Sequence, residues 1–367
     1  MKTLLYILAL SSLLFASSDT ASCKKCHPII TKEFESSMHK KSSIYDDKVH
    51  KAIWDLHPAK GKGDYNCAKC HTPNATTAAE QHEGITCISC HTIKDVEQHA
   101  KSNKNIYSDK PKTFYSAEAG RESEKVVYKQ TTSMFGLNKT TVGSAYHDID
   151  YTNEKFYNGQ MCMGCHSHKQ NAKQFDVCRT DDAGAKNKKE NCITCHMPKI
   201  DGTATTVRLS KQHAFHGFAG ARENPKMLSQ YVELGFKKSA AGFEVELNNK
   251  APHNLMLHPL RVVQLKATLI RDGKQTPLQT HSFVKTIGHD GQPSMPWLAT
   301  EVVKDTMIKA NEKRVVQFDE ALKSGDKVEV ILGYYVVNPK VLKKLDLQDD
   351  KELTKFTILK SQYFSVE

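Results

Sequence analysis

The sequence predicts a chain in two parts: a mainly α-helical and irregular first domain, followed by a β-sandwich-like C-terminal domain. The first observation is that all 11 cysteines fall between residues 23 and 195. The second is that, after about residue 225, apolar and polar side chains alternate as they do in half-buried strands. The length of 367 residues is sufficient for two ordinary domains. We therefore expect a signal peptide at 1–18, a first domain at 19–224 and a β-rich domain at 225–367.

Residues 1–18 have the features of a cleaved secretory signal peptide. Lys2 gives a positive start, residues 4–15 are apolar, and the small residues Ala16 and Ser18 precede the expected cleavage site. A retained membrane anchor is the alternative, but the apolar run is short for a bilayer. No later stretch is long and apolar enough to span one. We expect a periplasmic protein without stable membrane insertion, with an extracellular location as the second option.

Ten of the cysteines form five C-x-x-C pairs, and a histidine directly follows each pair. C-x-x-C-H is the signature of covalent c-type haem attachment, in which two thiols bond to the haem vinyl groups. The adjacent imidazole then binds the iron as the proximal ligand. The attachment cysteines are Cys23, Cys26, Cys67, Cys70, Cys87, Cys90, Cys162, Cys165, Cys192 and Cys195, and the proximal histidines are His27, His71, His91, His166 and His196. The first domain is thus predicted to be a multihaem domain, with five covalently bound haem c groups filling its core.

Other uses of paired cysteines explain the histidines less well. Zinc ribbons and thioredoxin-like sites need no histidine directly after C-x-x-C, and the chain has only 18 histidines. A disulfide framework is the remaining rival. Cys178 belongs to no pair, and we interpret it as a buried thiol because no ligand or redox pattern surrounds it.

The net charge of +11 suggests nucleic acid or a membrane surface as partner. Haem propionates would offset much of this charge, because each haem brings carboxylates into the protein. We interpret the excess of lysine and arginine as neutralising the cofactors, and we expect no nucleic-acid partner.

Three stretches of the C-terminal part alternate as strands do. They are residues 243–247, 263–269 and 328–336, and Asp272-Gly273 after the second is a tight hairpin signal. The resulting domain is either an independent module or a wall packed against the haem region. In the first domain, Ile30, Phe34 and Met38 recur every fourth residue and predict a helix.

The pattern resembles the cytochrome c-554 family and the multihaem core that this family shares with hydroxylamine oxidoreductases. The resemblance is carried by Cys23-Lys24-Lys25-Cys26-His27-Pro28, Phe34-Glu35-Ser36-Ser37-Met38-His39, the run from His82 through Gly84 to Cys87, His147 before Cys162, and His216-Gly217-Phe218-Ala219-Gly220. Residues 248–274 are similar to the β-domain that follows some of these haem regions. The chain has five haem-attachment motifs, which is more than cytochrome c-554 has and fewer than the hydroxylamine oxidoreductases have. It also lacks the C-x-x-C-K motif of ammonia-forming nitrite reductases.

The sixth iron ligands are chosen largely by this resemblance. The candidates are His39, His82, His147, His216 and His253, while His57, His99 and His213 are their rivals and His258 is the nearest substitute for His253. If residues 28–39 are helical, His39 lies about 18 Å along the axis from His27 and must serve a different haem. His168 follows His166 too closely to complete the same site.

Two axial histidines on every iron leave only electron transfer, whereas an open position admits a substrate. We expect a periplasmic electron carrier between respiratory partners, such as a quinol-oxidising membrane cytochrome and a terminal reductase. The alternative is an oxidoreductase acting on a small nitrogen or sulfur compound, such as hydroxylamine or nitrite, at one open haem. A third possibility is stacking of subunits into conductive filaments.

Overall fold

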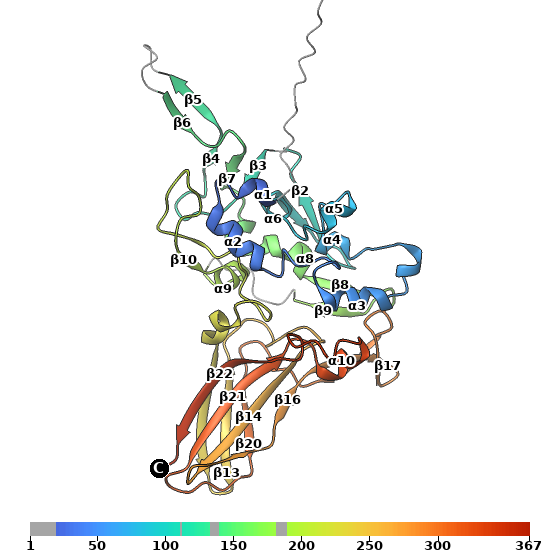
Figure 1. The fold of residues 1–367 in the computed structure, drawn as a ribbon, viewed down its shortest axis with the longest axis vertical. Coiled ribbons are helices and arrows are strands. Elements are labelled where there is room, and N and C mark those ends of the chain that lie inside the picture. Colours follow the sequence, from blue (N-terminus) through green and yellow to red (C-terminus); the bar gives the residue numbers. More distant parts are fainter. Residues whose placement is uncertain (1–19, 111, 133–138, 181–188) are drawn as a thin grey trace, which may run out of the picture.

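The computed structural model describes residues 20–110, 112–132, 139–180 and 189–367. The signal peptide expected at residues 1–18 lies outside the described residues. We call the described residues of 20–224 the N-terminal lobe and residues 225–367 the C-terminal lobe; Figure 1 shows the long strands of the second below the short helices and strands of the first. Within the described ranges, no helix is long and apolar enough to cross a membrane.

The N-terminal lobe consists of short helices and short strands. Its two longest helices are α2 (Pro28–Ser36) and α3 (Lys48–Leu56). Its other helices are α1 (Thr20–Cys23), η1 (Lys60–Lys62), α4 (Ala68–His71), α5 (Ala78–Gln81), α6 (Cys87–His91), α7 (Lys155–Asn158), η2 (Gln160–Cys162), α8 (Met163–His166) and α9 (Cys192–His196). Its strands are β1 (Ile93–Glu97), β2 (Lys104–Tyr107), β3 (Thr113–Tyr115), β4 (Lys125–Val126), β5 (Lys129–Thr132), β6 (Lys139–Val142), β7 (Asp148–Asp150), β8 (His168–Gln170), β9 (Asp176–Arg179), β10 (Lys199–Asp201) and β11 (Gln212–Ala214).

These strands form small sheets. The prediction of a mainly α-helical and irregular first domain did not include them. The sheets pair β1 with β2, β5 with β6, β8 with β9 and β10 with β11, and place β7 between β3 and β4. Every residue of β5 and β6 is exposed, so neither strand has the alternation that marks a half-buried strand. Strands this short and this exposed leave no hydrophobic pattern from which to predict them.

Local chemistry sets the limits of the two long helices. Pro28 begins α2, where its missing N–H costs no hydrogen bond. The helix ends at Ser36 because Ser37 is extended, so the predicted helix stops short of Met38. The carboxylate of Asp47 begins α3 by accepting hydrogen bonds from the backbone N–H groups of Val49 and His50.

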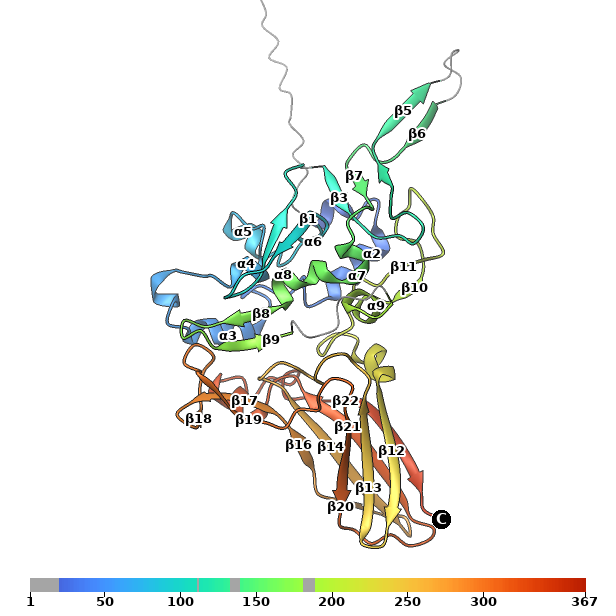
Figure 2. The same cartoon turned by 180° about the vertical axis from the view of Figure 1, so that it is seen from behind.

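The C-terminal lobe contains two large antiparallel sheets and a small third one. The large sheets have the orders β12-β13-β20 and β15-β14-β21-β22, with β16 also paired to β14, and the small one has the order β18-β17-β19. The elements are η3 (Pro225–Tyr231), β12 (Val232–Ser239), β13 (Gly242–Asn249), β14 (Val262–Arg271), β15 (Lys274–Pro277), β16 (His281–Phe283), β17 (Lys285–His289), β18 (Gln292–Pro293), β19 (Glu301–Asp305), β20 (Lys313–Phe318), β21 (Lys327–Tyr335), α10 (Pro339–Lys344) and β22 (Phe356–Ser365). Figure 2 shows the long strands running side by side away from the N-terminal lobe.

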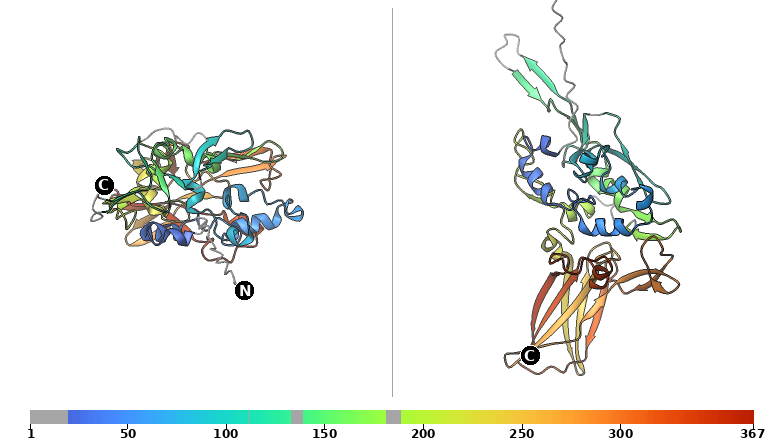
Figure 3. Two further views of the ribbon diagram at one scale, coloured as in Figure 1. Left: turned by 90° about the horizontal axis from the view of Figure 1, so that it is seen from above. Right: turned by 45° about the vertical axis from the view of Figure 1, so that its right-hand side comes forward.

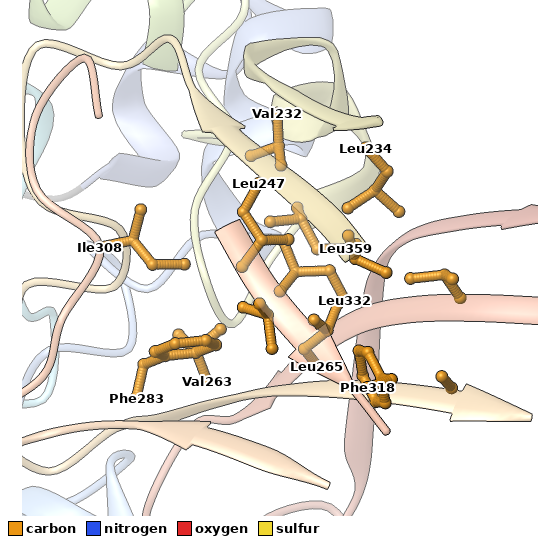
Figure 4. Packing of buried hydrophobic residues seen from close by; sticks show 14 of the residues in the cluster. Val232, Leu234, Leu247, Val263, Leu265, Phe283, Ile308, Phe318, Leu332 and Leu359 are labelled. Atoms are coloured by element: carbon orange, nitrogen blue, oxygen red, sulfur yellow. The ribbon is translucent and has the colours of Figure 1, made fainter. Parts of the chain in front are cut away.

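The three predicted strands are confirmed as parts of β13, β14 and β21, although Val336 lies one residue beyond β21. Asp272-Gly273 forms the predicted hairpin, because Arg271 pairs with Lys274 across it. Inward-facing side chains from both large sheets make the core, and Figure 4 shows Leu247, Leu265 and Leu332 packed together there. Each is at most 1% exposed, and burying such a side chain stabilises the fold by about 2 kcal/mol.

The two lobes meet along α3. Val49 of α3 packs in one apolar cluster with Val337, Leu342 and Leu345 of the C-terminal lobe, and Leu260 packs against this cluster. The side-chain amide of Asn171 donates hydrogen bonds to two backbone carbonyls of the C-terminal lobe. Figure 3 shows this junction from a second direction. The lobes are therefore held by packing as well as by the chain.

Candidate haem sites

Four of the five motifs fold in the same way. In each, a short helix ends on the histidine, namely α4, α6, α8 and α9, although Cys162 of the fourth motif belongs to the preceding η2. In the first motif, Cys23 instead ends α1 and His27 directly precedes α2, and the backbone N–H of His27 donates to the carbonyl of Cys23. One helical turn thus holds two thiols and an imidazole close together, as covalent haem attachment requires.

Backbone carbonyls orient most of the motif histidines. In four of them, Nδ1 donates to a carbonyl oxygen, which leaves Nε2 unprotonated and available to a metal. The donor and acceptor pairs are His27 to Ala204 (2.8 Å), His71 to Ser42 (2.9 Å), His91 to Tyr115 (2.7 Å) and His196 to Ala219 (2.6 Å).

Four motif histidines face a second histidine ring. The ring centroids are 6.2 Å apart for His27 and His147, 5.9 Å for His39 and His166, 6.3 Å for His91 and His216, and 6.2 Å for His196 and His253. Two imidazoles on opposite sides of one iron have nitrogens about 4 Å apart, since each Fe–N bond is about 2 Å, and their ring centroids are then about 6 Å apart. The spacing of all four pairs therefore fits a haem iron between the rings.

Two of the facing histidines are oriented by backbone carbonyls as most of the motif histidines are, whereas Nδ1 of His39 is buried and has no such partner among the described residues. His216 donates from Nδ1 to the carbonyl of Ala214 at 2.7 Å, and His253 does so to Asn254 at 2.9 Å. Burial lowers the pKa of His216 to about 3, so its ring is neutral at physiological pH. Burial has the same effect on the pKa of His39, which also falls to about 3. Neutral imidazoles are the form that binds a metal.

His71 has a different neighbour. The ring of His50 lies 4.1 Å from that of His71, too close for an iron between them. Both Nδ1 atoms bond to the same carbonyl, that of Ser42, and Nε2 of His50 lies 3.3 Å from the Tyr65 hydroxyl. His50 therefore lies beside His71 and not opposite it. In the described part of the chain, no imidazole faces His71 at the spacing of the other four pairs.

Of the five candidates for a sixth ligand, His82 is placed differently. Its ring stacks on Tyr45 with centroids 3.8 Å apart, whereas the other four candidates each face a motif histidine. Among the rivals, His213 has both nitrogens engaged, with the carbonyl of Gly202 and the carboxylate of Glu33. The ring of His57 packs on Trp54 and Trp297, and Nδ1 of His99 accepts from the backbone N–H of Lys101.

The attachment cysteines of different motifs touch one another. The Cys87 thiol is hydrogen-bonded to that of Cys23, and this contact, together with burial, raises the pKa of Cys87. Two further thiol contacts, Cys70 with Cys165 and Cys162 with Cys192, join the remaining motifs. The fourth motif is thus in contact with the second and the fifth. Sequence reasoning could not find these contacts, because they bring together residues as many as 95 positions apart.

The five motifs, the facing imidazoles and the fold define a multihaem c-type cytochrome that binds haem c covalently. Residues 22–92 match the protein family described as cytochrome c554 and c-prime. The fold is similar to that of a penta-haem cytochrome c552 from Thermochromatium tepidum, with a TM-score of 0.71 and 22% identity over 94% of this chain and 97% of that one. No curated protein matches the sequence.

Proposed function

We propose that this protein is a periplasmic pentahaem cytochrome that passes electrons between respiratory redox proteins. The observation that carries the proposal is the set of four facing histidine pairs. With two imidazoles on its iron, a haem has no position for a substrate and exchanges electrons only. His39, His147, His216 and His253 are the proposed sixth ligands, for the haems of His166, His27, His91 and His196 respectively.

The thiol contacts between motifs support rapid transfer within the molecule. Covalent attachment places each haem edge at its own cysteines, so cysteines of two motifs in contact bring two haem edges together. The first motif then neighbours the third, and the fourth neighbours both the second and the fifth.

Mass and spin state test this proposal together. Intact mass spectrometry of the exported protein should give the polypeptide without residues 1–18 plus five haems. Electron paramagnetic resonance of the oxidised protein should show at least four low-spin haems. Fewer haems, or haem released by acid-acetone extraction, contradicts covalent attachment. Two or more high-spin haems contradict the assigned pairs.

A second function is favoured by one observation, the absence of a facing imidazole at His71 among the described residues. A haem iron with an open sixth position binds small molecules directly. We propose that the site at His71 is where a small nitrogen or sulfur compound would react, with the other haems supplying or removing electrons. One high-spin haem that binds cyanide in the oxidised protein would support this function. Five low-spin haems would contradict this second function, and electron transfer would then be the only function proposed.

A further inference from the structure

The carboxylate of Glu33, on α2, contacts one of the facing histidines. Its Oε2 accepts a hydrogen bond from the backbone N–H of His216 at 2.9 Å. The ring of His216 faces that of His91, with centroids 6.3 Å apart and an interplanar angle of 16°. The ring itself is oriented by the hydrogen bond from Nδ1 to the carbonyl of Ala214. Glu33 therefore holds the backbone of a residue whose ring direction is set by the neighbouring chain.

A buried histidine holds Glu33 in turn. Nε2 of His213 lies 2.8 Å from Oε1 of Glu33, and Nδ1 of His213 lies 3.0 Å from the carbonyl oxygen of Gly202. A carbonyl oxygen can only accept, so Nδ1 carries a hydrogen, and one proton lies between Nε2 and the carboxylate. The pair is neutral as a whole wherever that proton resides, and the side chains of His213 and Glu33 are only 2% and 14% exposed. Burial therefore leaves no unpaired charge, and each carboxylate oxygen has a partner.

The contact joins segments that follow two different motifs. The helix of Glu33, α2, begins directly after His27 of the first motif. Strand β10 begins three residues after His196 of the fifth motif, and it pairs with β11, which contains His213 and leads to His216. Segments from the first and fifth motifs thus meet at the imidazole that faces the third motif.

We propose that Glu33 is a positioning residue for the haem between His91 and His216, with His213 as its support. This inference rests on the function proposed above, in which His216 is the sixth ligand of that haem. Thioether bonds fix the haem beside His91, but nothing covalent holds His216. Its approach to the iron therefore depends on hydrogen bonds and packing around it. The relative orientation of the two imidazole planes then shapes the low-spin spectrum of this one haem.

Electron paramagnetic resonance of the oxidised, haem-loaded protein tests this role. Glu33→Ala should shift the low-spin signal of one haem, or replace part of it by a high-spin signal, and leave the other signals unchanged. Glu33→Gln should restore the wild-type signal, because its amide oxygen can accept from the N–H of His216 while its amide N–H donates to Nε2 of His213. Glu35→Ala is the matched control and should change no signal. Glu35 lies on the same helix in an ion pair with Lys24, and both side chains are about half exposed, at 46% and 56%.

His216→Gly identifies the haem concerned. This variant should remove one low-spin signal and add one high-spin haem, because the iron loses its second imidazole. The signal that it removes should be the one that Glu33→Ala shifts. If Glu33→Ala does not retain five haems, His213→Ala takes its place and should shift the same signal by a smaller amount.

Three results would overturn the inference. Unchanged signals in Glu33→Ala and His213→Ala, with the expected effect of His216→Gly, would refute the role of Glu33 and leave the proposed function intact. Equal shifts in Glu33→Ala and Glu33→Gln would assign the effect to charge and not to position. If His216→Gly adds no high-spin haem, the ligand assignment itself fails, and the role of Glu33 fails with it.

Discussion

His196 and His253 come from different lobes, yet their rings lie 6.2 Å apart with an interplanar angle of only 20°. His253 follows β13 in a turn that is fixed by Asn249, whose amide donates to the carbonyls of His253 and Lys309. A C-terminal lobe without cysteine motifs thus places an imidazole at the last motif of the N-terminal lobe.

His253→Gly should therefore add one high-spin haem to the spectrum, because the haem at His196 loses its second imidazole. Added imidazole should restore the low-spin state by filling the space left by the side chain. Electron paramagnetic resonance and the visible spectrum measure both changes. His289→Gly, in the β17–β18 hairpin, is the control and should change neither. An unaltered spectrum of His253→Gly would remove this residue from the ligands.

His39 and His82 give a direct comparison between two residues that the sequence alone ranks alike. His39→Gly should produce one additional high-spin haem, because its ring is 5.9 Å from that of His166. His82→Gly should leave the spin state unchanged, since its ring stacks on Tyr45. Electron paramagnetic resonance spectra of the two oxidised variants measure the difference. The opposite result, with only His82→Gly gaining a high-spin haem, would support the original choice of His82.

Gly84 is needed where the chain passes close to His39. Its φ is +65°, and an added Cβ would lie 2.2 Å from the carbonyl oxygen of Lys40 and 2.9 Å from that of His39. Gly84→Ala should lower the free energy of unfolding by about 3 kcal/mol or more and should disturb the haem that His39 completes. Chemical denaturation followed by circular dichroism measures the loss.

Gly273→Ala is the matched control, with φ of +75° and nothing within 4 Å of the added Cβ. This variant should lower the free energy of unfolding by only about 1 kcal/mol, because alanine disfavours a positive φ, and it should leave the haem spectrum unchanged. Equal losses for the two variants would show that the close contact at His39 does not matter.

Arg271 and Asp326 form a two-point ion pair at the far end of the C-terminal lobe, with nitrogen–oxygen distances of 2.9 and 2.7 Å. The hydrogen bonds from Arg271 lower the pKa of Asp326 to about 2. The side chain is 3% exposed but lies at the open end of a sheet, so solvent screens the pair in part. Asp326→Asn should then lower the free energy of unfolding by about 1–2 kcal/mol at neutral pH.

The pH dependence has a definite sign. Because the folded-state pKa of Asp326 lies below its ordinary value, the carboxylate contributes fully above about pH 4, and the contribution disappears as the pH falls towards 2. The gap in stability between wild type and Asp326→Asn should close over that range in denaturant titrations. Asp290→Asn, at a side chain that is 86% exposed, should show almost no gap at any pH. A gap that persists at pH 2 would assign the loss to packing.

Sequence patterns predicted those parts of the structure in which residues of one kind recur at a regular spacing. The alternation in β14 and β21 identified two long strands because one face of each is buried, and the five C-x-x-C-H motifs indicated a multihaem c-type cytochrome. Pairing across the chain was harder to predict, since nothing local distinguishes His39 from His82. The identity of the ring opposite each motif histidine depends on how loops of the N-terminal lobe pack. His50 was not singled out at all, because its role as a neighbour of His71 follows from a shared carbonyl at Ser42.

The position of His253 also implies an order for haem attachment and folding. Synthesis delivers the N-terminus first, and all five motifs precede the strands that carry the last facing imidazole. Haem attachment to the cysteines can therefore precede folding of the C-terminal lobe. Until β13 and its turn have folded, the newest haem would hold a single histidine and a reactive iron. Folding of the C-terminal lobe is thus the step that brings a second imidazole to the last motif.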